Sequence, residues 1–225
     1  MKNRQKIIPL TFLIIGMMLI TAITAYSIRK HVKNSALNSE KAENTSVKEL
    51  GEKNIKTKDD LQLFFSKPEH IPSKTMIKIY KKKRVLELYG DENIIGRFKI
   101  GLGRSPEGDK EKEGDNKTPE GSYYICYRNG QTKYTYFLGL SYPNIKDAQN
   151  GLDKGLINKE TYEKIKDAID NYKQPPWNTP LGGAVGIHGG GNEYNWTYGC
   201  IAVSNEDVNI IKQYAPVKTP VEIYK

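Results

Sequence analysis

The chain has 225 residues, which is enough for one globular domain and a shorter appendage. Charged residues make up 27% of it, and 35 Lys and Arg against 26 Asp and Glu give a formal net charge of +9 at pH 7. No run of basic residues interleaved with aromatic residues marks a nucleic-acid groove, so we interpret the charge as a lysine-rich solvated surface and expect no nucleic-acid partner.

The N-terminal segment differs most from the rest of the chain. Lys2, Arg4 and Lys6 precede a stretch without charged residues at 7–28. These about 22 residues would reach roughly 33 Å as a helix, which crosses a bilayer core and exceeds the length of a secretory h-region. We therefore predict a short cytoplasmic tail and one transmembrane helix within residues 1–28, with the following chain on the extracytoplasmic side of the cell membrane. Secretion after cleavage near Ala25 is the alternative.

Residues 29–68 are polar and poor in aromatic residues, which is typical of a linker. Within this segment a short helix is predicted near residues 59–65, beginning at Asp59 or Asp60 and ending before Pro68. The globular domain is predicted to span residues 69–225.

Alternating apolar residues predict that this domain begins with an antiparallel meander. Its strands are expected at 76–80, 85–89 and 94–100, and further strands at 122–127, 135–142 and 221–223. A helical region is expected at 145–173, with Asn158 as an N-cap, and a helix after the N-cap candidate Ser204. The pattern indicates a β-rich α+β fold with peripheral helices.

The loop at 101–121 is rich in glycine and in charged residues. Because no helix follows it directly, a nucleotide-binding fold is not expected. Its acidic residues lack the spacing of an EF-hand and alternate with lysines, so we interpret them as solvated ion pairs. Two cysteines and one nearby histidine do not make a zinc site, and we predict no metal and no cofactor.

A histidine and a cysteine lie at opposite ends of one loop in the C-terminal third. The apolar run 184–187 leads into His188-Gly189, and Cys200 follows Trp196-Thr197-Tyr198-Gly199 and precedes another apolar run. A free thiol has a pKa of about 8.5, so it needs a base that takes its proton, and an imidazole can return that proton to a leaving amine. We therefore predict that Cys200 is a nucleophile and His188 its base.

Backbone groups complete this predicted site. The carbonyl of Gly189 is a candidate for orienting the imidazole. The N–H groups of Tyr198, Gly199 and Cys200 are candidates for an oxyanion hole. Two alternatives stay open: His188 is a packed structural histidine, or Cys200 forms a disulfide with Cys126.

The segment from His188 to Asn205 resembles the signature of the L,D-transpeptidase catalytic (YkuD-like) family, in its subgroup with a Trp-Thr-x-Gly-Cys-Ile-Ala motif. Upstream segments in the matching order also resemble the family, and they are Gly101-Leu102-Gly103, Gly108-Asp109-Lys110, Glu113-Gly114-Asp115, Thr118-Pro119-Glu120-Gly121 and Pro180-Leu181-Gly182-Gly183. The resemblance covers roughly residues 74–225.

The resemblance implies an L,D-transpeptidase-type β-sandwich or meander and acyl transfer on peptidoglycan stem peptides through a thioester, in cell-wall cross-linking or remodelling. It also places Trp196, Tyr198 and Asn205 at the substrate cleft. An L,D-carboxypeptidase or amidase of the same fold is the enzymatic alternative, and an inactive cell-wall-binding module is the non-enzymatic one. A sortase-like enzyme fits less well, because sortases need an arginine after the cysteine and here Ala202-Val203 follow.

Overall fold

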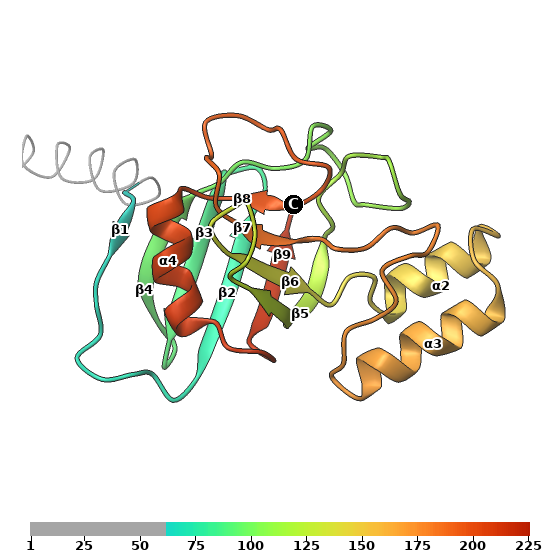
Figure 1. Cartoon of the computed structure of the whole chain (residues 1–225), viewed down its shortest axis with the longest axis horizontal. Helices are drawn as coiled ribbons and strands as arrows, with labels where there is room; N and C mark the ends of the chain where they lie inside the picture. The colour runs from blue at the N-terminus through green and yellow to red at the C-terminus, as the bar shows by residue number, and fades with distance from the viewer. Residues whose placement is uncertain (1–61) are drawn as a thin grey trace, which may run out of the picture. The chain divides into compact units, whose positions relative to one another are not determined.

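Residues 62–225 are described in the computed structural model, and Leu63–Lys225 form one compact unit (Figure 1). The predicted membrane segment at 7–28 and most of the predicted linker lie outside the described residues. Within residues 62–225, none of the helices combines the length and the apolar character needed to cross a bilayer.

Nine strands form a continuous sheet in the order β1-β4-β3-β2-β9-β5-β6-β7-β8. Their bounds are β1 Phe64–Phe65, β2 Thr75–Tyr80, β3 Val85–Gly90, β4 Asn93–Lys99, β5 Gly121–Asn129, β6 Phe137–Leu140, β7 Gly186–His188, β8 Ile201–Ala202 and β9 Pro220–Tyr224. The β2–β9 and β7–β8 pairs are parallel, and the other pairs are antiparallel. The predicted β-rich α+β fold and the β2–β3–β4 meander are confirmed, with one continuous sheet in place of two separate layers.

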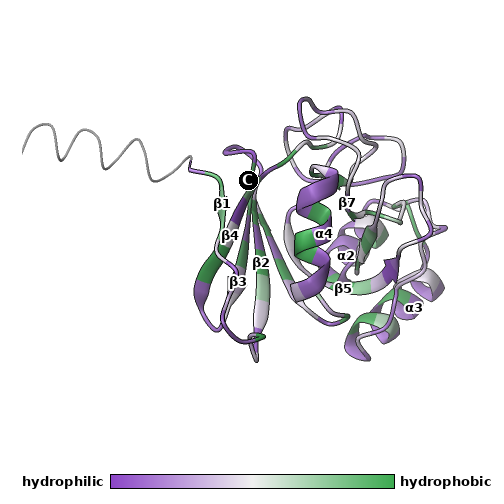
Figure 2. Cartoon of the chain, turned by 60° about the vertical axis from the view of Figure 1, so that its left-hand side comes forward, coloured by the Kyte–Doolittle hydropathy of each residue, from purple (hydrophilic) through white to green (hydrophobic). Residues whose placement is uncertain are grey.

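Within residues 62–225, three helices accompany the sheet, and they are α2 Ile145–Asp153, α3 Lys159–Asp170 and α4 Asn205–Tyr214. Figure 1 shows α2 and α3 side by side at one end of the unit and α4 against the sheet. The helix α4 begins at the predicted N-cap Ser204, whose hydroxyl accepts from the N–H of Asp207. In Figure 2, α4 carries hydrophobic residues among hydrophilic ones, as expected for a helix with one buried side.

The main core lies between the sheet and α4. Strand residues such as Ile77, Leu86 and Ile223 pack there with Val208 and Ile211 of α4. A second, smaller cluster of Ala148, Ile157, Ile165 and Leu181 holds α2 and α3 together.

Two local predictions differ from the structure. The helix predicted near residues 59–65 is wrong for Phe64 and Phe65, which form β1 and pair with Arg97 and Gly96 of β4. Packing of the Phe65 ring against Phe98, at 6.5 Å between centroids, explains why an edge strand replaces a helical turn here. The β1 strand therefore belongs to the compact unit, ahead of the predicted boundary at residue 69.

The single helical region predicted at 145–173 is divided into α2 and α3. Gly155 has a φ of +69°, which interrupts the helix, and the side chain of Asn158 starts the next one by accepting from the N–H of Thr161. The predicted cap at Asn158 is confirmed.

Candidate active site

Two short parallel strands bring His188 and Cys200 to the same face of the sheet. In the β7–β8 pair, Ile187 lies opposite Ile201 and His188 lies opposite Ala202. Both isoleucines point into the main core, so the alternation of side chains puts His188 and Ala202 on the other face. Cys200 directly precedes β8 and continues the row of Ala202. Cys200 is therefore offset by two residues from the position opposite His188. Such an offset on neighbouring strands corresponds to about 8 Å between the two Cα atoms.

One hydrogen bond determines how the imidazole of His188 is oriented. The Nδ1 atom lies 2.6 Å from the carbonyl oxygen of Gly189. A carbonyl can only accept, so we assign the proton of the neutral ring to Nδ1. The Nε2 atom then carries the free lone pair and can act as a base. The structure thus places the Gly189 carbonyl where the sequence predicted it.

Aromatic side chains enclose this imidazole, which is only 3% exposed. The Tyr134 ring stacks on it at 4.5 Å between centroids, and the Trp196 ring meets it edge-on at 5.5 Å. This burial lowers the pKa of His188 below its usual value, and the bond to Gly189 only partly opposes the shift. The histidine is therefore neutral at pH 7 and ready to accept a proton.

Cys200 is half-buried and carries a free thiol. The thiol donates to the carbonyl oxygen of Ala184 at 3.6 Å. Burial raises the pKa of Cys200 to about 11, with the backbone N–H of Gly186 acting in the opposite direction. Cys126 on β5 is also free, and burial raises its pKa to about 12. The two cysteines do not form the disulfide that the sequence left open.

The turn before Cys200 requires glycine. Gly199 has a φ of +137°, and a Cβ atom there would lie 2.7 Å from the carbonyl oxygen of Lys117. Its N–H donates to the hydroxyl of Thr197 at 3.2 Å, and that hydroxyl donates to the carbonyl oxygen of Cys200 at 2.7 Å.

This arrangement affects one of the three N–H groups predicted for an oxyanion hole. The N–H of Gly199 is engaged by the buried hydroxyl of Thr197, so it does not serve an oxyanion hole in this conformation. The N–H groups of Tyr198 and Cys200 are left as candidates.

The other predicted cleft residues lie in different surroundings. Trp196 packs on His188, and its Nε1 donates to the carbonyl oxygen of Gly191 at 3.1 Å. The Asn205 side-chain oxygen accepts from the N–H of Gly190 at 2.9 Å and from the Thr135 hydroxyl at 2.8 Å, so it braces the segment after His188. The Tyr198 side chain is 70% exposed, and the Arg104 guanidinium lies 4.7 Å from the centroid of its ring.

Sequence reasoning missed Tyr134 and Thr197. Tyr134 stacks on His188, and its carbonyl oxygen accepts from the N–H of Gly189 at 3.1 Å, although it is far from both in the chain. The sequence did contain a signal for Thr197. This threonine lies two residues before Gly199 and three before Cys200, and a threonine near a turn often forms hydrogen bonds with the backbone of that turn.

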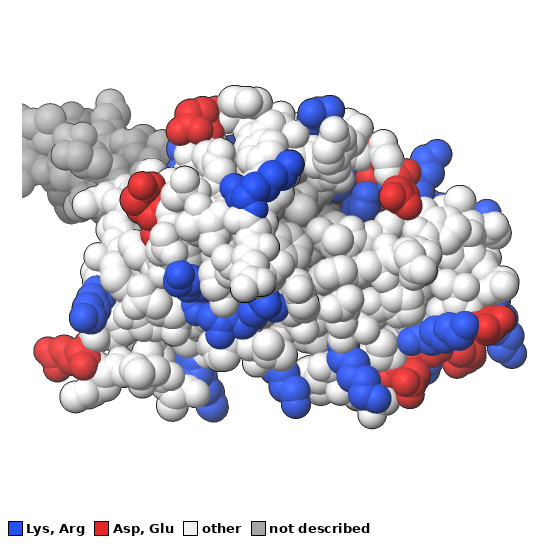
Figure 3. Space-filling model, in the orientation of Figure 1, with Lys and Arg blue, Asp and Glu red and all other residues white. Residues whose placement is uncertain are grey.

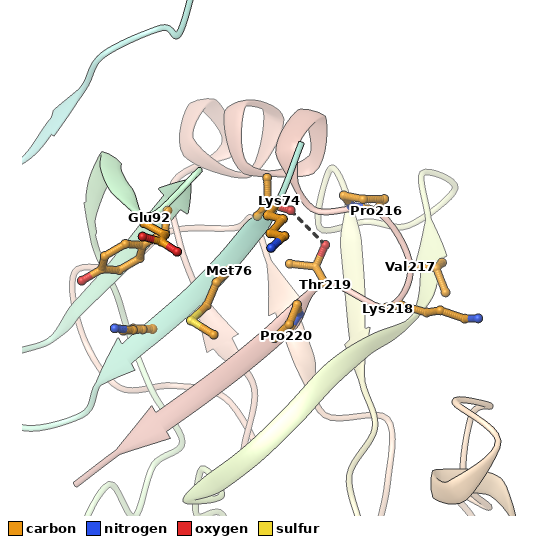
Figure 4. A pocket seen from close by; sticks show the side chains of 11 residues that line it. Lys74, Met76, Glu92, Pro216, Val217, Lys218, Thr219 and Pro220 are labelled. Carbon is orange, nitrogen blue, oxygen red and sulfur yellow. Dashed lines mark hydrogen bonds between the residues drawn. The ribbon is translucent and has the colours of Figure 1, made fainter. Parts of the chain in front are cut away.

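A separate cavity of about 570 Å³ lies between the first residues of β2 and the segment that leads into β9 (Figure 4). Its walls include Met76, Pro220 and the side chains of Lys74 and Lys218, and none of the predicted site residues lines it. On the face shown in Figure 3, basic side chains are spread out with acidic ones among them, which agrees with a solvated charged surface. Within residues 62–225, no cluster of three His, Cys, Asp or Glu side chains is placed to hold a metal ion.

A free thiol and a neutral imidazole on one face of a sheet are the components of a cysteine-dependent enzyme site. Residues 74–223 match the model of the L,D-transpeptidase catalytic domain (YkuD), and the chain belongs to this family. No curated protein matched the chain in a sequence search.

Several solved structures resemble the chain. The L,D-transpeptidase from Xylanimonas cellulosilytica is 15% identical with a TM-score of 0.40, covering 72% of this chain and 65% of that one. A variant of the helical cell shape determining protein Pgp2 from Campylobacter jejuni is 23% identical with a TM-score of 0.49, covering 72% and 49%. An Enterococcus faecium L,D-transpeptidase variant is 14% identical with a TM-score of 0.40, covering 68% and 50%. The chain thus spans from about half to 65% of the length of these structures.

Proposed function

We propose that this protein is an L,D-transpeptidase-type enzyme that modifies peptidoglycan stem peptides, with Cys200 as the nucleophile and His188 as the base. Membership of the L,D-transpeptidase catalytic domain family supports the class of enzyme and of substrate. The observation that carries the residue roles is the 2.6 Å hydrogen bond from His188 Nδ1 to Gly189, which leaves Nε2 unprotonated on the face of the sheet that also bears Cys200.

The first half-reaction forms a thioester. Nε2 of His188 takes the thiol proton while Sγ of Cys200 attacks a carbonyl at an L-to-D junction of the stem peptide. The resulting oxyanion accepts hydrogen bonds from the N–H groups of Tyr198 and Cys200. When the carbon–nitrogen bond breaks, the imidazolium returns the proton to the leaving amine, and the acyl group stays on the sulfur.

The second half-reaction releases the thioester. An acceptor amine attacks the same carbonyl, His188 takes a proton from it, and the carbon–sulfur bond breaks as that proton passes to the sulfur. The product is a cross-link. When water is the acceptor, the same steps give a shortened stem peptide, which is the L,D-carboxypeptidase outcome.

The protonation states of Cys200 and His188 before substrate binds support a mechanism in which His188 takes the thiol proton during the attack on the carbonyl. The pKa of Cys200 is raised to about 11 by burial, and that of His188 is lowered by burial, so both the thiol and the imidazole are neutral at pH 7. Such positioned proton transfer contributes about 10²- to 10⁴-fold to the rate of comparable enzymes.

The decisive experiment incubates the full chain with purified muropeptides and follows products and intact protein by mass spectrometry. We expect a thioester adduct on Cys200 and either new cross-links or shortened stems, which separates transpeptidase from hydrolase. Cys200→Ala abolishes adduct and products, while Cys126→Ala, which changes a half-buried cysteine on β5, keeps both. Full activity of Cys200→Ala would exclude the proposed mechanism.

We also infer from the sequence that residues 7–28 anchor the enzyme in the cell membrane, with the catalytic unit on the extracytoplasmic side, where its polymer substrate lies. Fractionation of cells that express the full chain tests this: the chain belongs in the membrane pellet and is released by detergent. A chain found in the medium and lacking residues 1–25 would show cleavage instead.

A further inference from the structure

The loop at 101–121 contains a buried ion pair that the sequence did not suggest. Its charged residues were expected to be solvated, and this is wrong for Lys110 and Asp115, whose side chains are only 3% and 9% exposed and lie 2.8 Å apart. By contrast, Glu111 pairs with Lys154 at the surface, with both side chains about half exposed. A lysine is almost never fully buried unless its ammonium is paired, and Asp115 is the partner that makes the burial of Lys110 possible.

Asp115 holds this lysine firmly. The Asp115 carboxylate accepts from Lys110 Nζ and from the N–H groups of Glu111, Lys112 and Lys117 at 2.8 to 3.1 Å. Burial alone would raise the pKa of Asp115, but these hydrogen bonds outweigh it and lower the pKa below the usual value. Lys110 Nζ also donates to the carbonyl oxygen of Lys112 at 2.9 Å, so the loop closes around the ammonium group.

The aliphatic part of Lys110 lies against Gly199, the residue before Cys200, and against Gly182, close in sequence to the residue that accepts the thiol hydrogen bond. Its Cδ atom is 3.8 Å from the position that a Cβ atom on Gly199 would take, and Gly199 directly precedes Cys200. Its Cε atom is 3.5 Å from the corresponding position on Gly182, two residues before Ala184, which accepts the thiol hydrogen bond. In the described part of the chain, Lys110 is the one charged side chain that acts on the pKa of Cys200, and it lowers that pKa against the larger effect of burial.

We propose that Lys110 is a positioning residue for Cys200, whose buried ammonium group stabilises the thiolate that develops as His188 takes the proton. A lysine ammonium next to a cysteine lowers the pKa of the thiol, and this effect is stronger where water is excluded. This inference rests on the proposed role of Cys200 as the nucleophile. The ammonium comes with its partner, the Asp115 carboxylate, so the charge next to the thiol is that of an ion pair whose lysine stem lies against Gly199.

The test measures the pH dependence of Cys200 alkylation by iodoacetamide in the full chain without substrate, with the modified peptide identified by mass. In Lys110→Met we expect the midpoint of the alkylation profile to rise by about one pH unit, and the rate at pH 7.5 to fall about tenfold. Lys110→Arg, which keeps the charge, should restore most of the rate.

Lys81 provides a matched control. It is also a buried lysine bonded to the same loop, with Nζ 2.8 Å from the Glu120 carboxylate and 2.6 Å from the carbonyl oxygen of Gly108. It does not act on the pKa of Cys200. Lys81→Met therefore removes a similar buried ion pair and should leave the alkylation midpoint unchanged, whatever it does to stability.

If Lys110→Met does not fold by circular dichroism, the pair Lys110→Met with Asp115→Asn removes both charges together, and a smaller rise of the midpoint is expected because no unpaired carboxylate is left behind. An unchanged midpoint in the folded variant, or an equal shift in Lys81→Met, overturns the proposal. So does a raised KM for muropeptides with an unchanged midpoint, since Lys110 would then bind substrate. Because alkylation needs no substrate, inactivity of the wild-type chain on muropeptides would refute the proposed function without affecting this comparison.

Discussion

Replacing Thr197 by valine tests how the turn before Cys200 is held. The two side chains have the same shape, so the change removes only a hydroxyl that is part of a residue 3% exposed. That hydroxyl accepts from the N–H of Gly199 at 3.2 Å and donates to the carbonyl oxygen of Cys200 at 2.7 Å. Leaving both backbone groups without this partner should lower the free energy of unfolding by about 2 to 4 kcal/mol.

The same change should also impair catalysis. The backbone of Thr197 stays bound to Leu102 and Arg104, so the loop as a whole keeps its place while the Gly199–Cys200 turn loses its brace. A displacement of the nucleophile by about 1 Å can cost roughly 100-fold in rate, and we expect a loss of kcat of that order.

Urea denaturation and the muropeptide assay measure the two effects on the same preparation. Thr219→Val is the control, since this buried threonine contacts the Thr75 hydroxyl at 3.4 Å and lines the separate cavity. It should change stability slightly and leave turnover unchanged. A Thr197→Val variant with the stability and the turnover of the wild type would refute the assignment of this hydroxyl as the brace of the turn.

Two pH-dependent predictions follow from the buried titratable groups. Because burial lowers the pKa of His188, kcat/KM should keep its plateau down to about pH 6.5 and fall only at lower pH; an acid limb centred above pH 7 would contradict a desolvated neutral base. Asp147, a buried residue in the first turn of α2, has its pKa raised to about 7 by burial, so its protonated form is favoured in the folded protein. The protonated carboxyl contributes to the free energy of unfolding in full below its unfolded pKa of about 4. This contribution, at most about 4 kcal/mol, is lost as pH rises towards 7. Asp147→Asn should abolish this loss, so the stability of the variant relative to the wild type should increase from pH 4 to pH 8 in urea titrations, and a constant difference would disprove it.

The strands and helices that were predicted correctly are determined by residues close together in the sequence. The meander of β2, β3 and β4 follows from alternation over a few positions, and α4 follows from a cap at Ser204 and a stripe of Val208 and Ile211. The placement of Cys200 and His188 next to two strands that pair directly was also accessible, because both lie at the ends of one loop. The hydrogen bond from His188 to Gly189 joins adjacent residues, which is why sequence reasoning reached it.

The failures involve contacts between distant parts of the chain. Phe64 and Phe65 form a strand because β4 offers an unpaired edge and Phe98 a packing partner. Lys110 alternates with acidic residues as a solvated lysine would, and only the closure of its loop around Asp115 buries it. The N–H of Gly199 is engaged because the hydroxyl two residues earlier turns inward.

The sequence by itself predicted which groups do chemistry, namely the thiol of Cys200 and the imidazole of His188, each next to a glycine and within a family signature. It also determined the local strands and helices, since these depend on periodicity and caps that are written in consecutive residues. Tertiary structure alone decided the surroundings of those groups, namely the Tyr134 ring on the imidazole, the Thr197 hydroxyl under the turn and the Lys110 side chain against Gly199. The reason is physical: burial, which shifts the pKa values and determines which N–H groups are engaged, arises where segments far apart in the chain pack together, and periodicity within one segment carries no record of it.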